Sequence, residues 1–493
     1  MLGSSLLNAA AGLLSLVAGF GSSVIVARTL GVEGAGIVAY ALWIMTVATL
    51  LSDFGMPQAV LRFVGQADGG DGARPGLVLL LTRRFVLTTG TLAAAIVGYA
   101  LWLDYAGKAT ATLIWIATAA LFLSYAYSTM SLGAAQGLGR FRESSLNTAI
   151  GCLVQPFLVA LGAVLLGPAG AIFGHVFRHL PQALSLPKYL KPAARGIEPV
   201  TPPMKAYARN AWLSGGLTAL LGSRVELAVI GLFFNLVAVG HYAIASTMAG
   251  MVVQLSYFLV APLVPLFSHH SDRGDHAALT KSYRRSLLGL LLVIAPVSLG
   301  GAAISPVLIP LLFGEDFRSS VALSVVLLGF TVFSALITVP YRLMLAREKS
   351  GTVLRLSLLE GLACIGLLFA TVPLFGTMAA AVVKGLTLTA SCIFCLWYCH
   401  RRLGIACDLL ALAKVLLAAA LCAAAAGGCI WWMPNLAGMA IGILTGAIAY
   451  ALGLALLGAV PAEERRMVAD LAKARLPAPL AGMLSRAILA GRG

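Results

Sequence analysis

The chain has 493 residues, of which 60% are hydrophobic and only 11% are charged. A soluble globular domain carries about 25% charged residues, so the composition excludes an ordinary globular protein. The formal net charge is +16, from 34 Lys and Arg against 18 Asp and Glu.

Apolar stretches recur along nearly the whole chain, each long enough to cross a hydrocarbon core about 30 Å thick. We therefore predict an all-α polytopic membrane protein with about fourteen transmembrane helices. Because no basic residue precedes Arg28, the first stretch is interpreted as an uncleaved span and not as a signal peptide. The predicted spans are 6–27, 36–57, 84–103, 110–135, 145–166, 169–187, 209–232, 236–266, 286–313, 320–341, 354–375, 377–399, 409–432 and 436–459.

A repeat appears late in the second predicted span. The stretch SDFGMPQAVLRFVGQADGGD at 52–71 is echoed after 204 residues by SYFLVAPLVPLFSHHSDRGD at 256–275, with seven of twenty paired positions identical. The pair Arg83–Arg84 is followed 201 residues later by a second pair, Arg284–Arg285. Six predicted spans separate the two copies, so both enter the bilayer in the same direction. Parallel halves of this kind usually flank a substrate path.

The repeat predicts two parallel six-helix lobes, 1–187 and 209–400. The connection 188–208 is rich in proline and basic residues, which suits an extended cytoplasmic linker. Two further spans at 401–460 form a C-terminal helix pair outside the repeat. The tail 461–493 mixes charged and apolar residues, and both a solvated tail and a helix lying on the inner leaflet fit it.

The distribution of Lys and Arg predicts the orientation, because basic connections stay cytoplasmic. With the N-terminus inside, 28 of the 34 basic residues lie in cytoplasmic segments. We expect both termini in the cytoplasm, and no nucleic-acid partner is needed to explain the charge. The six exceptions are Arg28, Lys108 and Arg318 in outer loops, and Arg178, Arg224 and Lys384 within spans.

Short connections leave no room for a soluble catalytic domain. The outer loops hold four acidic residues, and the sequence has no phosphate-cradling glycine loop with a lysine, no convincing metal cluster and no nucleophile elbow. The prediction is therefore a protein that is not an enzyme, with no catalytic or metal-ligating residues. A membrane-embedded sugar polymerase or ligase, or a noncatalytic assembly scaffold, is a candidate of a different class.

The run VARTLGVEGAGIVAYALWI at 26–44, followed by SDFGMPQAVLRFVGQ at 52–66, resembles the polysaccharide and O-antigen flippases of the multidrug/oligosaccharidyl-lipid/polysaccharide exporter superfamily. The resemblance extends over the whole chain in span count, repeat and C-terminal pair. It implies two lobes that face each other through spans one, two, seven and eight and alternate between inward-open and outward-open states. The implied cargo is an oligosaccharide linked to undecaprenyl pyrophosphate.

The same resemblance keeps two alternatives open within the superfamily, a peptidoglycan lipid II flippase and a multidrug extruder. Extruders generally have twelve spans, which argues against that branch. The implied partners are the lipid-linked oligosaccharide and membrane lipids, with a polysaccharide polymerase and chain-length proteins as candidates. No cofactor is expected, and H+ and Na+ are the candidate coupling ions.

Charged residues inside spans are costly and are functional candidates by default. Arg224 in span seven is the first candidate for a pyrophosphate contact, because a guanidinium pairs bidentately with phosphate oxygens. His175, Arg178 and His179 share one face of span six and form a second group of substrate-binding candidates. A structural role in packing or snorkelling explains that group about as well.

Residues near span ends complete the set of candidates. Arg28 and Arg62 are included as substrate-binding candidates, although anchoring to headgroups is the default at such positions. Asp53 is expected to pair with Arg62 or a neighbouring span, or to carry a proton in ion coupling. Pro57 and Pro262, at similar places in the two copies, are expected to bend their helices.

Glu226 and Lys384 are predicted to form an intramembrane ion pair in the C-terminal lobe. At 1.5 Å per residue, their depths in spans seven and twelve differ by only about 5 Å. The pair is either a structural staple or the site where a coupling ion competes with the lysine.

Overall fold

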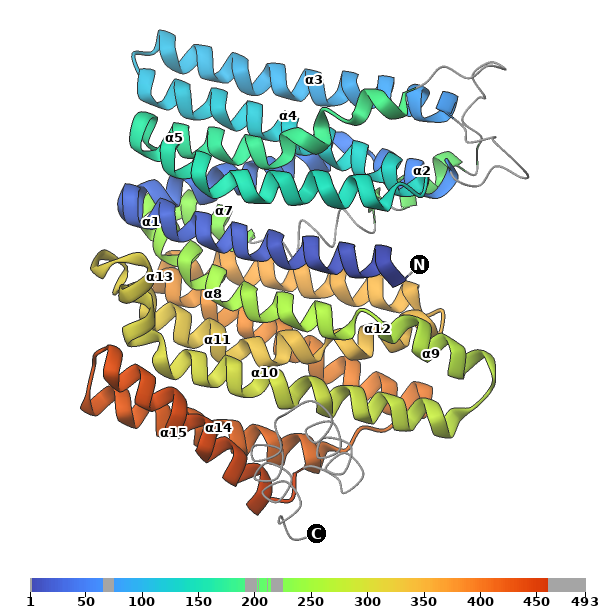
Figure 1. Cartoon of the computed structure of the whole chain (residues 1–493), viewed down its shortest axis with the longest axis vertical. Helices are drawn as coiled ribbons and strands as arrows, with labels where there is room; N and C mark the ends of the chain where they lie inside the picture. The colour runs from blue at the N-terminus through green and yellow to red at the C-terminus, as the bar shows by residue number, and fades with distance from the viewer. Residues whose placement is uncertain are drawn as a thin grey trace. The chain divides into compact units, whose positions relative to one another are not determined.

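The computed structural model describes residues 2–64, 75–190, 202, 204–210, 212–213 and 225–459. The regular structure of these residues is helical, so the predicted all-α class is confirmed (Figure 1). The helices are α1 (Leu2–Asp53), α2 (Met56–Phe63), α3 (Pro75–Tyr105), α4 (Ala109–Gly137), α5 (Phe141–Ala183), η1 (Leu186–Tyr189), α7 (Val225–Phe233), α8 (Leu236–Val260), α9 (Leu263–Asp272), α10 (His276–Phe313), η2 (Glu315–Phe317), α11 (Ser320–Leu336), α12 (Thr338–Ala346), α13 (Ser350–Leu403), α14 (Leu409–Trp432) and α15 (Leu436–Leu456).

Three of these helices are interrupted at a glycine with non-helical φ and ψ. The apolar part of α1 has 44 residues, and as one straight rod it would measure about 66 Å, more than twice the thickness of a hydrocarbon core. The chain reverses at Gly31, with φ 66° and ψ −165°, a conformation that is essentially restricted to glycine. Helix α5 reverses at Leu166–Gly167, and α13 is interrupted at Gly376, which is again a glycine with positive φ.

These reversals account for the number of membrane spans. Within the described residues, ten helices are long and apolar enough to cross a membrane. Since α1, α5 and α13 each consist of two helices joined at such a break, those ten helices provide thirteen spans. Helix α7 is the described part of the span predicted at 209–232. The number therefore agrees with the prediction of about fourteen.

The chain forms two compact units. One comprises Met1–Ile244 with Ser357–Ala380, and the other comprises Ala245–Leu356 with Ala381–Gly493. The first has an apolar core around Val60, Phe85 and Met130, and the second has a core around Phe267 and Leu291. The predicted lobe limits at 187, 208 and 400 stay predictions.

The two repeat copies break their helices at similar places. In the first copy α1 ends at Asp53, and Phe54 and Gly55 take positive φ before α2 begins, with Pro57 in its first turn. In the second copy Pro262 precedes the start of α9. The helices are therefore interrupted near both prolines, as predicted.

The outward surfaces of the helices are apolar, as contact with lipid tails requires. Phe157, Val164, Leu374 and Leu456 each expose more than 70% of their surface. Trp431 and Trp432, at the end of α14, are more than 80% exposed. Tryptophan at the end of a span is typical of the interface between lipid tails and water.

Candidate functional site

The turns of the two repeat copies make a reciprocal backbone contact. A Cβ atom on Gly36 would lie 1.9 Å from the carbonyl oxygen of Leu236, and one on Gly240 would lie 2.1 Å from that of Val32. Both distances are far below van der Waals contact. Gly36 and Gly240 are 204 residues apart, and so are Val32 and Leu236, which is the spacing of the sequence repeat. In each copy, the glycine therefore contacts the carbonyl oxygen of the equivalent residue in the other copy.

This contact joins the start of the second half of α1 to the start of α8. Each helix follows directly on a reversal of the chain, at Gly31 in one copy and at Asn235 in the other. Since no side chain intervenes at the two glycines, the helices cross at backbone distance. Tyr40 continues the contact one turn further along α1, because its ring would touch a Cβ on Gly231.

A second candidate feature is a polar cluster inside the first unit, centred on Arg178. One terminal nitrogen, Nη1, donates a hydrogen bond to Gln155 Oε1 at 3.3 Å, and Nη2 donates to Ser15 Oγ. The amide of Gln155 also contacts His175, with 3.1 Å between Nε2 and Nδ1. Both partners of the guanidinium are neutral, so these bonds hold Arg178 in place without cancelling its charge.

Small residues bring the members of this cluster together. The two halves of α5 lie so close that a Cβ on Gly151 would be 2.0 Å from the carbonyl oxygen of Arg178. Near the hairpin tip, Gly162 and Gly170 make a similar backbone contact. Because the halves approach this closely, Gln155 on the outgoing half reaches both His175 and Arg178 on the returning half.

The predicted histidines occupy different places around this arginine. His175 is buried, with 7% of its surface exposed. The ring of His179 packs edge-on against Tyr125 of α4, with 5.0 Å between centroids. On α1, Gly19 leaves space beside the guanidinium, because a Cβ there would come to 3.4 Å from Nη1. The three residues of the predicted group thus face α1, α4 and the other half of α5.

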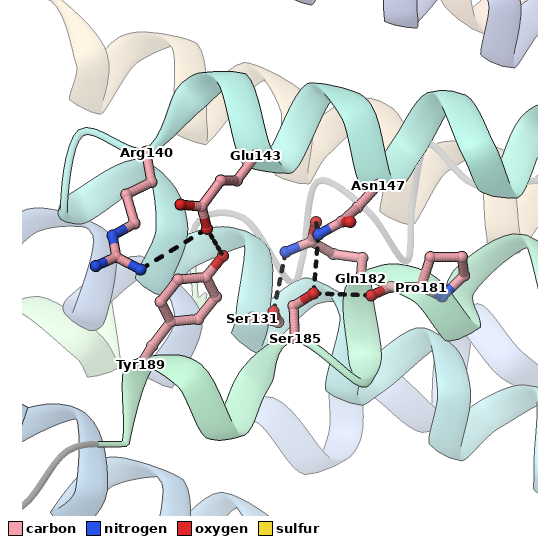
Figure 2. Close-up of polar contacts among 8 residues, drawn as sticks. All are labelled: Ser131, Arg140, Glu143, Asn147, Pro181, Gln182, Ser185 and Tyr189. Carbon is pink, nitrogen blue, oxygen red and sulfur yellow. Dashed lines mark hydrogen bonds and ion pairs between the residues drawn. The ribbon is translucent and has the colours of Figure 1, made fainter.

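A further polar network continues along α5 beyond this cluster (Figure 2). Gln182 donates through Nε2 to Ser131 Oγ at 2.9 Å and accepts from Asn147 Nδ2 at 3.3 Å. Asn147 also donates to Ser185 Oγ at 2.9 Å, and Ser185 donates to the carbonyl oxygen of Pro181 at 2.9 Å. The network ties α4, both halves of α5 and the turn before η1 together.

The end of this network carries charge. Tyr189 donates from its hydroxyl to Glu143 Oε2 at 3.2 Å, and Arg140 Nη1 lies 3.7 Å from the same oxygen. The guanidinium carbon of Arg140 also lies 5.6 Å from the centre of the Tyr189 ring. Figure 2 shows the three side chains converging beside η1. Because Arg140 and Glu143 are half exposed, their pairing contributes little to stability.

A cationic cavity lies where α1 breaks into α2, with a volume of about 460 Å³. A Cβ on Gly55 would lie 2.1 Å from the carbonyl oxygen of Ala208, so the segment 204–210 packs directly on the break. Trp212 Nε1 donates to the carbonyl oxygen of Leu50 at 2.7 Å. Arg84, Lys205 and Arg209 supply positive charge to the lining. Residues 204–210 are helical, so the part of the predicted linker at 204–208 is not extended.

The candidates at span ends have local contacts. Asp53 Oδ1 accepts from the backbone nitrogen of Gly55 at 2.8 Å, so the carboxylate caps the break after α1. Arg62 is exposed, and its guanidinium carbon lies 4.5 Å from the centre of the Tyr207 ring. Arg28 is also exposed. The contacts of Asp53 and Arg62 favour structural and anchoring roles for these two residues.

The remaining candidates are Arg224, Glu226 and Lys384, and the structure describes only the last two. Arg224 lies outside the described residues, so its role stays a prediction. Glu226 is 2% exposed on α7, and Lys384 is half-buried on α13. They belong to different compact units, and their predicted pairing stays a prediction.

Sequence reasoning missed the residues that position Arg178. Ser15 and Gln155 are uncharged, so a search for intramembrane charges passes over them. Gly36 and Gly240 carried a usable signal, because they are identical residues at the repeat spacing of 204, outside the twenty positions that defined the repeat.

Comparisons with known proteins agree with this architecture. A family model described as polysaccharide biosynthesis protein matches residues 25–322. A Shigella flexneri protein named "Putative O-antigen transporter" is 23% identical over 397 residues, covering 77% of this chain and 93% of that protein.

Two solved structures share the fold. The lipid II flippase MurJ in an inward closed conformation has a TM-score of 0.68 at 12% identity, covering 92% of this chain and 99% of that one. An inward-facing multidrug resistance MATE family transporter of the MOP superfamily has a TM-score of 0.63 at 14% identity, covering 81% and 96%. At these identities the likeness concerns the fold alone.

Proposed function

Because the chain belongs to the polysaccharide biosynthesis protein family, we propose that it moves undecaprenyl-pyrophosphate-linked oligosaccharides from the inner to the outer leaflet for surface polysaccharide synthesis. The chain is a multi-pass membrane protein with the fold of transporters. The cargo has an anionic pyrophosphate, a polar sugar chain and an apolar tail. A protein that moves it needs positive charge inside its membrane-spanning part.

The observation that carries this proposal is the arrangement around Arg178. A guanidinium presents planar pairs of N–H groups that fit phosphate oxygens bidentately. Gln155 and Ser15 hold this one at a fixed position, and because both are uncharged these two bonds do not neutralise the guanidinium. The cationic lining formed by Arg84, Lys205 and Arg209 supports a route on which the pyrophosphate meets positive charge before it reaches Arg178.

The reciprocal contact of Gly36 and Gly240 supports alternating access. Two helix ends that meet at backbone distance, with no side chains between them, can seal one end of a transport path. Both glycines lie in the first compact unit, so the contact would separate in the opposite state through a movement of α8 relative to α1. Coupling to H+ or Na+ would supply the free energy for an uphill cycle.

This function requires no covalent chemistry, so we propose that the protein is not an enzyme. The proposed undecaprenyl-linked cargo supports a bacterial inner membrane as its location, and the distribution of basic residues supports cytoplasmic termini. A polysaccharide polymerase that consumes the flipped unit and chain-length proteins are the proposed partners.

A second candidate function is the translocation of lipid II, favoured by the coverage of the MurJ fold at 92% of this chain and 99% of that one. Both cargoes contain a pyrophosphate and a polyprenyl tail. Only recognition of the sugar portion can therefore distinguish the two functions.

Complementation in two bacterial strains tests the proposal. One strain lacks its O-antigen flippase, and the other depends on a regulated lipid II flippase. We expect the chain to restore surface polysaccharide in the first strain, with no accumulation of lipid-linked intermediate, and to fail in the second. Rescue of the second strain alone would replace the proposed cargo by lipid II. Rescue of neither strain by a membrane-inserted protein would count against both.

A further inference from the structure

The second unit contains a cavity of about 600 Å³ between the starts of α10 and α14. It is formed within one unit and is separate from the residues around Arg178. Positive and ionisable residues come mainly from the first turns of α10, and the segment before α14 closes the other side. The polar lining residues on which the inference rests are His276, Lys281, Arg284, Arg285, Cys407 and Asp408.

The charge of this lining is strongly positive. Among the described residues that line the cavity, α10 supplies three cationic side chains and Asp408 supplies a carboxylate. The carboxylate caps α14, because Asp408 Oδ1 accepts from the backbone nitrogen of Ala411 at 3.0 Å. Arg284 is fixed at the wall by its Nε, which donates to the carbonyl oxygen of Ala406 at 2.8 Å. That bond uses one of the five N–H groups of a guanidinium.

The lining of the cavity changes from charged to apolar along the helices. Leu287 and Leu288 of α10 and Leu412 of α14 also belong to the lining. The cations at 281, 284 and 285 precede these leucines, so charge lies at the start of α10 and apolar surface further along it. Both helices are membrane spans that begin at the cavity, at His276 and Leu409. Polar headgroups pass into lipid tails at this level of a bilayer.

The same basic pair behaves differently in the first repeat copy. Arg84 lines the cavity at the break between α1 and α2, beside Phe54, Phe63 and Trp212. The segment 204–210 closes that cavity. Arg284 and Arg285 instead face the start of α14, which belongs to the C-terminal pair outside the repeat. The C-terminal pair therefore creates an anion-attracting cavity that the repeat alone does not contain.

We propose that the cavity between α10 and α14 binds the phosphate headgroup of an anionic phospholipid of the surrounding membrane. Lys281, Arg284 and Arg285 contact the phosphate, and the acyl chains lie along the apolar part of the cavity. Basic pockets between spans on the cytoplasmic side commonly take such headgroups. This lipid is distinct from the transported cargo. It fastens the C-terminal pair to the six-helix half beside it.

Cys407 offers a probe inside the cavity. It is partly exposed, and burial raises the pKa of its thiol above the ordinary value, so its alkylation is slow but measurable. An anionic headgroup beside it will slow alkylation further, both by covering the thiol and by disfavouring the thiolate. Cys429 near the other end of α14 is also partly exposed and serves as the internal control.

The test uses the full-length protein in nanodiscs of phosphatidylcholine, either alone or mixed with cardiolipin. N-ethylmaleimide alkylation of Cys407 and Cys429 is followed by peptide mass spectrometry. We expect cardiolipin to slow the alkylation of Cys407 roughly fivefold, the effect of one favourable cation–lipid contact, and to leave Cys429 unchanged. Equal rates for Cys407 in the two lipids would overturn the proposal.

Two variants and one solute separate a specific site from a general charge effect. The double variant Lys281→Gln with Arg285→Gln should lose the protection, whereas Arg402→Gln, an exposed change in the last turn of α13, should keep it. Protection that survives in the double variant would contradict the site. Inorganic phosphate in phosphatidylcholine discs should not protect Cys407, and if it did, a free anion would replace the lipid as ligand.

Discussion

The returning halves of α5 and α13 occupy equivalent places in the two repeat copies, yet they carry different side chains. Eight residues after the turn glycine stands His175 in one copy (167 to 175) and Lys384 in the other (376 to 384). Eleven residues after it stand Arg178 and Thr387. Thr387 donates to the carbonyl oxygen of Val383 in its own helix at 2.9 Å, whereas Arg178 bonds to other spans.

The comparison separates two kinds of feature. The backbone contact of Gly36 and Gly240 is shared between the copies and can serve a motion in which both take part. The Arg178 cluster exists in one copy, so it serves a contact that needs no symmetry, such as one end of an asymmetric cargo. Substitutions at a shared feature should therefore impair export in either copy. Substitutions at an unshared feature should impair export only in the copy that has it.

The largest effect is expected at the shared contact. Gly36→Val and Gly240→Val each place a side chain where a backbone oxygen lies, at a cost of about 1–3 kcal/mol or more. Both should abolish export to a similar degree. Surface polysaccharide in a complemented strain is the measurement, with membrane protein level as its reference.

Gly21→Val provides the matched control, because a Cβ at Gly21 of the same helix meets nothing within 4 Å. It should leave export unchanged. A strong defect in only one of the two copies would show that the contact does not act as a symmetric pair.

The second-largest effect on export is expected at Arg178, which has no counterpart in the second copy. Arg178→Ala removes the guanidinium and should lower export about tenfold or more, the loss expected for a charged hydrogen bond to the cargo. Thr387→Ala, at the equivalent place in the second copy, should change export less than about twofold. Arg178→Lys should recover part of the activity, because it keeps the charge but loses the bidentate fork.

Export assays with matched protein levels decide this prediction. Equal losses for Arg178→Ala and Thr387→Ala would remove the distinction between the copies. Normal export by Arg178→Ala would remove the arginine from the proposed site altogether.

A subtler change keeps Arg178 and cancels its charge. Gln155→Glu puts a carboxylate where the amide oxygen now accepts from Nη1. Because the new pair neutralises the guanidinium, export should fall about tenfold, while the melting temperature in detergent should not fall. Unchanged export would show that the charge of Arg178 is not used by the cargo.

The smallest effect on export is expected in the network of Figure 2. Gln182→Leu removes the bonds to Ser131 and Asn147 and should cost about 1–3 kcal/mol of stability, because partners are left unsatisfied. Export should stay within about twofold once protein level is corrected. Thermal unfolding in detergent measures the first quantity. A loss of export at normal stability would assign the network to the transport path.

Much of the fold follows from the apolar pattern. The turn glycines Gly31, Gly167 and Gly376 all lie in the gaps between predicted spans, at 28–35, 167–168 and 376. An apolar run has to stop where the chain meets water, and only glycine easily adopts the reversed conformation. Residues 204–208 of the predicted linker are helical and not extended, because they gain packing against the break at Gly55 that composition cannot reveal. The limits of the linker and its cytoplasmic location stay predictions.

The site was less accessible to sequence reasoning. The charged and imidazole side chains of Arg178 and His175 stand out in an apolar span, so their positions could be predicted as candidates. Gln155 and Ser15 could not, since their contacts depend on how closely the two halves of α5 and the first half of α1 pack. That distance is set by Gly151 and its neighbours, whose role appears only in three dimensions.

Translocation in proteoliposomes tests the central claim most directly. The purified full-length chain is reconstituted with a fluorescent undecaprenyl-pyrophosphate oligosaccharide placed in one leaflet, and an impermeant quencher reports transfer to the other. The account predicts transfer by the native chain, at least about tenfold slower transfer by Arg178→Ala, and no effect of Thr387→Ala. Absence of transfer by the correctly reconstituted native chain, or equal transfer by Arg178→Ala, would contradict it.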